Sequence, residues 1–363
     1  MPKRIAVVVS QSQSKNPARR KLEEDIVTGL IMEPGVDVTI VPNLYDLAAD
    51  GTGMVALKGI SGNMVVCGWM FERAGHWVLD RNGIHGHVGP VMLRDDSEDD
   101  EEDLDESADD EKARVIDERE IPNRKIYCLD LRISNKAKVY IEEIKRIQHE
   151  NNAQVVGLGD LIGNAPMPAT SPNGNGVANG VVANGHNGAA NGEQPSEQDA
   201  AAPSIVNRVE DPAKRRWYPV IDYSRCTNCM ECIDFCLFGV YGVDRIDTIL
   251  VEEPDNCRKG CPACSRVCPE NAIMFPQHKT PGIAGSHEAS ASLKIDLSQL
   301  FGAPTDGKSA IEVAALERDE QLAMAGRDTV GMSVGIPKRQ DAGSDGPKDD
   351  LDDLVDELND FDL

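Results

Sequence analysis

Short apolar runs alternate with segments of helical periodicity between residues 5 and 147. The apolar runs predict buried strands, which lie at Ile5–Val9, Val36–Val41, Met64–Cys67 and Lys125–Leu131. Apolar residues at helical spacing predict helices over Ala18–Leu30 and Val139–Ile147. A further helix is expected over Leu44–Leu57, with Asn43 as its N-cap. Strands that alternate with helices favour a small α/β domain with a parallel sheet.

A change of composition divides the chain into parts. The segment after the last predicted helix is rich in Asn, Gly, Ala, Ser and Pro, which favours a flexible, disordered linker. We therefore predict an α/β domain at 1–162, a linker at 163–204, a second domain at 205–280 and a tail at 281–363. The tail is expected to be mostly extended or disordered with short helices, one of them from Ser309 to Ala325.

The negative charge is concentrated in two runs. The formal net charge is −25, and most of it lies in Asp95–Glu111 and Asp349–Asp362. Such blocks repel themselves and stay solvated, so we expect an exposed acidic loop at 95–120. Leu351–Leu358 has an apolar helical face and is either a docking peptide or a frayed, solubilising end. An acidic chain of this kind lacks the basic face that nucleic acid requires.

The apolar runs are too short for a membrane span or a secretory signal. Ile5–Val9 is followed by Ser and Gln, whereas a membrane helix needs about 20 apolar residues. We therefore expect a cytoplasmic protein without membrane insertion. In such a chain, closely spaced cysteines indicate a metal site rather than a disulfide framework.

Eight of the ten cysteines form two closely spaced runs. The first run has the spacing C-x2-C-x2-C-x3-C and the second C-x3-C-x2-C-x3-C-P, and their members are Cys226, Cys229, Cys232 and Cys236, then Cys257, Cys261, Cys264 and Cys268. Zinc sites usually combine two pairs of ligands around one tetrahedral ion. Three thiolates on one tight loop suit a face of an iron–sulfur cubane better, so the pattern favours clusters over zinc.

Residues 217–276 resemble bacterial-type dicluster ferredoxins. The resemblance rests on the apolar lead-in Tyr218–Ile221, the two cysteine runs and the sequence Cys268-Pro-Glu-Asn-Ala-Ile273. It implies an α+β domain built as a two-fold repeat of strand, cluster loop, helix and strand. The complete expected fold is thus a ferredoxin-type dicluster domain joined by a disordered linker to the α/β domain, with disordered acidic segments.

The same resemblance implies two [4Fe–4S] clusters with crossed ligands, because the fourth cysteine of each run binds the other cluster. The first cluster would be held by Cys226, Cys229, Cys232 and Cys268, and the second by Cys257, Cys261, Cys264 and Cys236. The second run departs from the family pattern by one extra residue within Arg258-Lys259-Gly260, and Cys236 is followed by Leu237 rather than Pro. The widened loop and its Arg258-Lys259 pair make the second cluster the less ordinary one.

Basic residues adjoin several of these cysteines, namely Arg225, Arg258, Lys259 and Arg266. They either raise the reduction potentials of the clusters or form a docking face for an acidic partner, and a third possibility is that they are merely solvated charges.

The constellation predicts an electron-transfer protein: a ferredoxin-like carrier or an electron-transfer subunit of an oxidoreductase, with redox proteins as partners. No catalytic residue is expected beyond the cluster ligands. Two alternatives stay open. In one, the α/β domain binds a flavin or a thiol substrate and the chain is itself a redox enzyme. In the other, the chain is a redox-responsive adaptor whose acidic segments bind a partner.

The α/β domain offers few candidates for such an enzyme. Ser10–Ser14 follows the first strand, where a phosphate loop or an ordinary polar turn would lie. Leu44–Ile84 resembles the start of heterodisulfide-reductase A-type subunits through Cys67 and His76, although a buried structural role for Cys67 is the simpler interpretation. Cys128 is expected in the core, and His85 and His87 on a surface loop.

Overall fold

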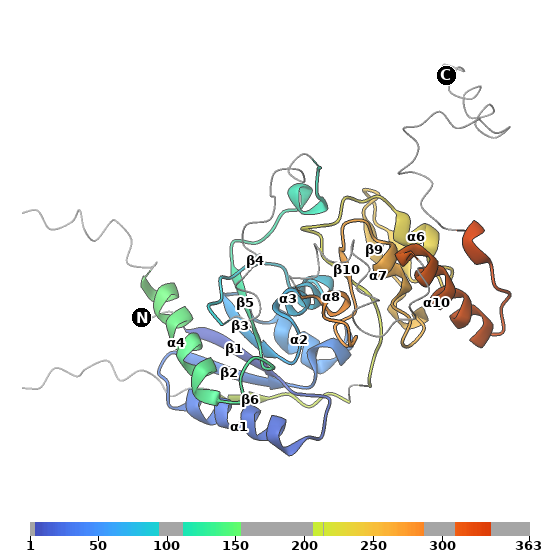
Figure 1. Ribbon diagram of the computed structural model, residues 1–363. Coiled ribbons are helices and arrows are strands. Elements are labelled where there is room, and N and C mark those ends of the chain that lie inside the picture. Colours follow the sequence, from blue (N-terminus) through green and yellow to red (C-terminus); the bar gives the residue numbers. More distant parts are fainter. Residues whose placement is uncertain (1–3, 94–111, 154–205, 213, 287–308, 335–363) are drawn as a thin grey trace, which may run out of the picture.

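The computed structural model describes residues 4–93, 112–153, 206–212, 214–286 and 309–334 (Figure 1). The predicted linker at 163–204, the acidic run Asp95–Glu111 and the tail segment Leu351–Leu358 lie outside the described residues. Within them, no helix combines the length and the apolar character that a membrane crossing would require.

A parallel sheet forms the centre of the amino-terminal part. Its strands lie in the order β4-β5-β3-β1-β2-β6, and each neighbouring pair is parallel. The bounds are β1 Ile5–Ser10, β2 Val36–Val41, β3 Met64–Gly68, β4 His87–Val88, β5 Lys125–Asp130 and β6 Val206–Arg208. Four of these strands lie where apolar runs predict them. The edge strands β4 and β6 were not expected, and β6 comes from the segment that the sequence assigned to the second domain.

Helices cover both faces of this sheet (Figure 1). Their bounds are α1 Pro17–Ile31, α2 Thr52–Lys58, α3 Glu72–Arg81 and α4 Ala137–Ala153. Val7 and Val9 of β1 pack with residues of α1 and α4, whereas Val8 packs with residues of α2 and α3. Because side chains alternate along a strand, one continuous apolar run supplies both cores.

The segment Leu44–Leu57 is not one helix, contrary to the prediction. A 3-10 turn, η1 Leu44–Asp46, is capped by Asn43, and Leu47 is extended before α2 begins at Thr52. Tertiary contacts account for the break, because the carboxylate of Asp46 accepts a hydrogen bond from the backbone N–H of Arg216 at 3.0 Å.

The cysteine-rich part repeats the order strand, loop, helix, strand. The first unit contains β7 Val220–Ile221, α6 Glu231–Phe235 and β8 Tyr241–Val243, and the second contains β9 Ile249–Val251, α7 Ala263–Val267 and β10 Ile273–Met274. β7 pairs antiparallel with β10, and β8 with β9, so each two-stranded sheet joins the two units.

The two parts share a hydrophobic core instead of merely touching. Tyr218, Val220 and Met274 belong to the same buried cluster as the residues of α2 and α3. Tyr45 and Tyr218 stack with ring centroids 4.3 Å apart, and the hydroxyl of Tyr218 donates to the backbone oxygen of Tyr45 at 2.9 Å. The cysteine-rich part is therefore held in a fixed place on the α3 side of the sheet.

The end of the predicted acidic loop is packed against the cysteine-rich part. Residues 112–120 include the 3-10 turn η3 Val115–Glu118, in which Val115 is buried. The N–H groups of Val115 and Ile116 donate to the backbone oxygens of Cys226 and Tyr223 at 2.9 and 3.1 Å. Residues 112–120, called the strap below, thus lie over the first cysteine loop and are hydrogen-bonded to its backbone.

Among the described residues, the second cysteine run is followed by the helices α8 Pro281–Ala284 and α10 Ala310–Met324, and then by the 3-10 turn η5 Gly331–Ser333. Ser309 is the N-cap of α10, and its side chain forms a capping box with Glu312. This helix packs on α7, and Arg266 of α7 forms an ion pair with Glu317 of α10 at 3.0 Å. The tail therefore contributes to the environment of the second cysteine run.

Candidate metal centre

The cysteines lie on two loops of similar geometry. In the first, Asn228 and Met230 have positive φ angles of 60° and 64°, which turn the chain sharply between successive cysteines. Cys232 lies on α6 and Cys236 directly follows it, with the N–H of Cys236 donating to the oxygen of Cys232 at 3.1 Å. The backbone therefore directs several thiols of one short segment toward a common side.

The second loop reaches a similar arrangement despite its extra residue. Gly260 adopts a φ of 89°, and the N–H of Cys261 donates to the oxygen of Arg258 at 3.0 Å. Cys264 lies on α7 and Cys268 directly follows that helix, as Cys236 follows α6. A glycine in the left-handed region accommodates the extra residue as a turn.

Two cavities lie against these loops, and four cysteines line each of them. The first cavity has about 370 Å³ of empty space and the second about 330 Å³, part of it open solvent. The first is lined by Cys226, Cys229, Cys232 and Cys268, and the second by Cys236, Cys257, Cys261 and Cys264. Each cavity thus receives three cysteines from one run and the last cysteine of the other.

The electrostatic interactions between the thiols follow the same division. Burial, followed by the charges of Cys268, Cys226 and Cys229, raises the pKa of Cys232. Burial, followed by the charges of Cys236, Cys257 and Cys261, raises the pKa of Cys264. Burial likewise raises the pKa of Cys226 and of Cys261 to about 11. The apoprotein therefore disfavours the thiolate forms, and a bound metal group would supply the positive charge that stabilises them.

Among the described residues, no group of three or more His, Cys, Asp or Glu side chains is placed to hold one metal ion. The sulfur atoms surround cavities rather than a single point. A tetrahedral zinc site requires all its thiolates at about 2.3 Å from one ion. The donor set therefore fits a larger metal group better than a single ion.

Hydrogen-bond donors reach sulfur atoms at both cavities. The N–H of Ala272 donates to Cys268 Sγ at 3.3 Å, and the hydroxyl of Tyr241 donates to Cys264 Sγ at 3.0 Å. Such bonds stabilise negative charge on sulfur and tune a bound cluster. Tyr241 is buried and lines the second cavity, which therefore has a side-chain donor in addition to the backbone N–H groups that reach Cys236 and Cys261.

The four basic residues beside the cysteines lie in different surroundings. Arg258 lines the second cavity, Lys259 is exposed, and Arg266 is occupied by Glu317. Arg225 lies 3.8 Å from Asp222 and is not among the residues that line the first cysteine cavity.

Sequence reasoning missed Arg318, which lies in α10 and also lines the second cavity. The sequence did contain an indication of its burial, because Arg318 shares a helical face with Ala314 and Leu322, which are both buried. An arginine on the buried face of a predicted helix indicates a specific partner inside the protein.

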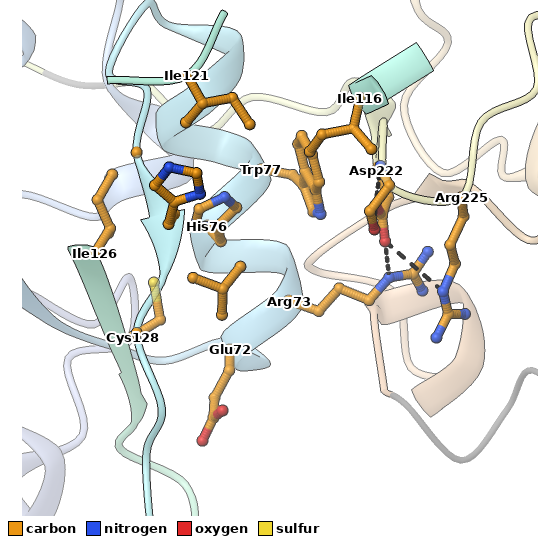
Figure 2. A pocket seen from close by; sticks show the side chains of 15 residues that line it. Glu72, Arg73, His76, Trp77, Ile116, Ile121, Ile126, Cys128, Asp222 and Arg225 are labelled. Atoms are coloured by element: carbon orange, nitrogen blue, oxygen red, sulfur yellow. Dashed lines mark hydrogen bonds and ion pairs between the residues drawn. The ribbon is translucent and has the colours of Figure 1, made fainter. Parts of the chain in front are cut away.

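A larger cavity, with about 840 Å³ of empty space including open solvent, lies between the α/β part and the loop that leads to Cys226. Figure 2 shows His76 and Trp77 on α3, with Ile126 and Cys128 on one side and Asp222 and Arg225 on the other. His76 is 4% exposed, and its Nδ1 has no hydrogen-bond partner among the described atoms. Burial lowers the pKa of His76, which keeps the imidazole neutral. A buried polar atom without a partner at a cavity wall indicates a bound water or ligand.

The remaining amino-terminal candidates do not assemble as the sequence suggested. Cys67 is fully buried in the core beneath α1 and α4, and burial raises its pKa to about 12. His76 lies on the opposite face of the sheet, where Cys128 is its cysteine neighbour in the cavity wall. His87 lines the same cavity, whereas His85 is paired with Asp80 at 2.8 Å.

The loop Ser10–Ser14 already holds a carboxylate. The N–H of Ser12 and the indole N–H of Trp69 both donate to Glu23, at 2.6 and 2.9 Å, and this side chain is buried. A phosphate placed here would meet the negative charge of Glu23. The N–H of Ser12 is therefore already used by Glu23, while Arg19 and Arg20 also reach Ser12, at 3.2 and 2.8 Å.

Comparison with known proteins gives one informative similarity. The chain is 47% identical over 66 residues to an uncharacterized ferredoxin of Methanocaldococcus jannaschii, a stretch that covers 18% of this chain and 44% of that ferredoxin. The chain thus spans less than half the length of this relative. No family model and no solved structure matches. The similarity to a ferredoxin suggests iron–sulfur binding and an electron-transfer role for that stretch.

Proposed function

We propose that the chain is an electron-transfer protein that carries two [4Fe–4S] clusters. The first cluster would be bound by the four cysteines of the first cavity, and the second by the four cysteines of the second cavity. The observation that carries this proposal is the division of eight thiols into two sets of four, each around its own cavity. Cysteine spacing leads to the same two sets, and the similarity to a ferredoxin supports the same chemistry.

A bound [4Fe–4S] cluster supplies one-electron oxidation and reduction. The protein itself would bind the two clusters, orient them and shield them. Ile221, Ile249 and Ile273 give the first cavity apolar walls, and Phe235, Val240 and Tyr241 do the same at the second. The fixed contacts of both loops leave little to rearrange when charge changes, which suits a carrier or an electron-transfer subunit with redox proteins as partners.

Metal and sulfide analysis tests this proposal. Protein purified without oxygen is expected to contain about eight iron atoms and about eight inorganic sulfides per chain, because each cubane contributes four of each. Bound zinc with almost no sulfide would refute it. Co-purification with an oxidoreductase would distinguish a subunit from a free carrier, and partner binding that depends on the oxidation state would favour the adaptor.

A second candidate function is favoured by the large cavity. Its walls are mostly apolar, it contains the unpartnered Nδ1 of His76, and it lies beside the loop that leads to Cys226. These features are typical of a site for a small organic molecule between two parts of a protein. We propose that such a molecule, if redox-active, would exchange electrons with the first cluster.

Titration with free riboflavin, followed through quenching of tryptophan fluorescence, tests this function. Saturable quenching that His76→Phe abolishes is expected, and its absence in wild type would contradict a flavin-type ligand.

A further inference from the structure

Arg318 is a buried arginine in the middle of α10, far along the chain from the cysteine runs. Its side chain is 1% exposed and lines the second cavity. Nη1 donates to the backbone oxygen of Val334 at 2.7 Å, and Nη2 donates to that of Gly331 at 2.6 Å. These bonds fix the guanidinium group in one place beside the second set of cysteines.

One carboxylate, that of Asp319, forms an ion pair with Arg318. Its Nε lies 3.4 Å from the carboxylate of Asp319, which also accepts a shorter bond, 2.7 Å, from the N–H of Gly331. The guanidinium carbon lies 4.5 Å from the ring centroid of Phe235, the residue before Cys236. Burial raises the pKa of Cys236, while backbone N–H groups and the charge of Arg318 act in the opposite direction. The electric field of Arg318 therefore reaches a sulfur atom of the second set.

Carboxyl groups, rather than guanidinium groups, line the first cavity. The charged side chains that line it are Glu231, which is buried, and Glu270. Glu270 is paired with Lys112 and Arg114 of the strap, at 2.8 and 3.1 Å. The charged side chains that line the second cavity are Arg258 and Arg318. Carboxyl groups thus line the first cavity and guanidinium groups the second, while the charge of Glu317, which is paired with Arg266, also acts on Cys261.

We infer that Arg318 holds the second cluster at a higher reduction potential than the first, so that a single electron taken up by the chain resides on the second cluster. This inference rests on the proposed function. An added electron makes a thiolate-bound cluster more negative, and a fixed cation in a poorly solvated environment stabilises that reduced form. The two halves of the symmetric repeat are thereby made unequal by a helix that lies outside residues 217–276.

A purely structural role for Arg318 leads to different expectations. Arg318 also ties the turn at Gly331 and Val334 to α10, so its removal could loosen this turn without any effect of charge. Arg318→Gln removes the charge, whereas Arg318→Lys keeps the charge but cannot form the same pair of bonds. Arg327 provides a matched control, because it follows the same helix, is exposed and donates to the oxygen of Leu237 at 2.7 Å.

The experiment is a redox titration of the full chain, purified without oxygen and followed by electron paramagnetic resonance. Iron and sulfide are counted first in every variant. Cys229→Ser and Cys261→Ser assign the two transitions, since each is expected to remove the signal of one cluster. We expect two resolved transitions in wild type, with the second cluster reduced first. Arg318→Gln should lower the potential of the second cluster alone, and Arg318→Lys and Arg327→Gln should leave it close to wild type.

The possible results distinguish a failure of the proposed function from a failure of the inference about Arg318. Protein without about eight irons and sulfides would contradict the proposed function itself. Full clusters with the first cluster reduced before the second would overturn the inference alone. So would equal shifts in Arg318→Gln and Arg318→Lys, or an unchanged potential in Arg318→Gln.

Discussion

Arg73 of α3 and Asp222 of the loop before Cys226 form an ion pair that is buried on both sides, with side-chain exposures of 3% and 2%. Arg73 also donates from Nη2 to the backbone oxygen of Asn271 at 2.6 Å, and Asp222 accepts from the N–H of Ser224 at 2.9 Å. One arginine of the α/β part thus fixes both ends of the cysteine-rich part. The pair links the larger cavity to the first cysteine loop (Figure 2).

Removal of one partner of this pair should destabilise the protein strongly. Arg73→Met leaves the carboxylate of Asp222 buried with reduced compensation, and such changes cost about 3–5 kcal/mol. Urea unfolding of the metal-loaded chain measures the loss. Arg4→Met removes the part-exposed pair with Asp37 and should cost no more than about 1 kcal/mol. Equal losses in the two variants would show that Arg73 does not anchor the cysteine-rich part.

Crossed ligation predicts which cysteine substitutions resemble one another. Cys268→Ser should leave the same residual spectrum as Cys226→Ser, and Cys236→Ser the same as Cys257→Ser, because each pair lines one cavity. The iron content of each variant should fall from about eight toward about four per chain. Cys67→Ser serves as the control, because Cys67 is buried in the core of the α/β part. If Cys268→Ser instead matched Cys257→Ser, the crossed assignment would be wrong.

Buried parallel strands could be predicted from the sequence because both faces of such strands are covered. Val7, Val8 and Val9 form an unbroken apolar run, and all three are fully buried. The edge strands β4 and β6 carry no such signal, since His87, Val88 and all of β6 are exposed and are held by backbone pairing to β5 and β2. Their existence depends on the partner strand rather than on their own residues.

The cysteine sets could be predicted from spacing, but their surroundings could not. Arg318 becomes part of the second cavity only because α10 packs on α7 and because Gly331 and Val334 offer their backbone oxygens. The strap at 112–120 likewise reaches the first loop through backbone bonds that no periodicity encodes. Contacts between segments far apart in the sequence decide which charges surround a site, and a local pattern does not contain them.

The widened second loop should depend on Gly260. Its φ of 89° lies in the region that a side chain disfavours, and no atom lies within 4 Å of the position that a Cβ would occupy, so strain is the whole expected effect. Gly260→Ala should lower the free energy of unfolding by about 1–2 kcal/mol. Gly62→Ala is the matched control, because it has equal space and no positive φ. Equal stability of the two variants in urea unfolding would refute a requirement for glycine in this turn.

Stability should fall in mild acid because of His76. Burial lowers the pKa of this imidazole, against the attraction of Asp80 and Asp222, whereas in the unfolded chain it titrates near 6.5. Above that pH both states hold neutral His76. Below it the unfolded chain binds a proton that the folded protein does not, so the free energy of unfolding decreases with falling pH, by up to about 1.4 kcal/mol per pH unit.

His76→Gln should reduce this slope, measured by urea unfolding, between about pH 6.5 and 5.5. The burial of His278 lowers its pKa as well, so some slope should persist in His76→Gln, but a slope identical to wild type would contradict the prediction.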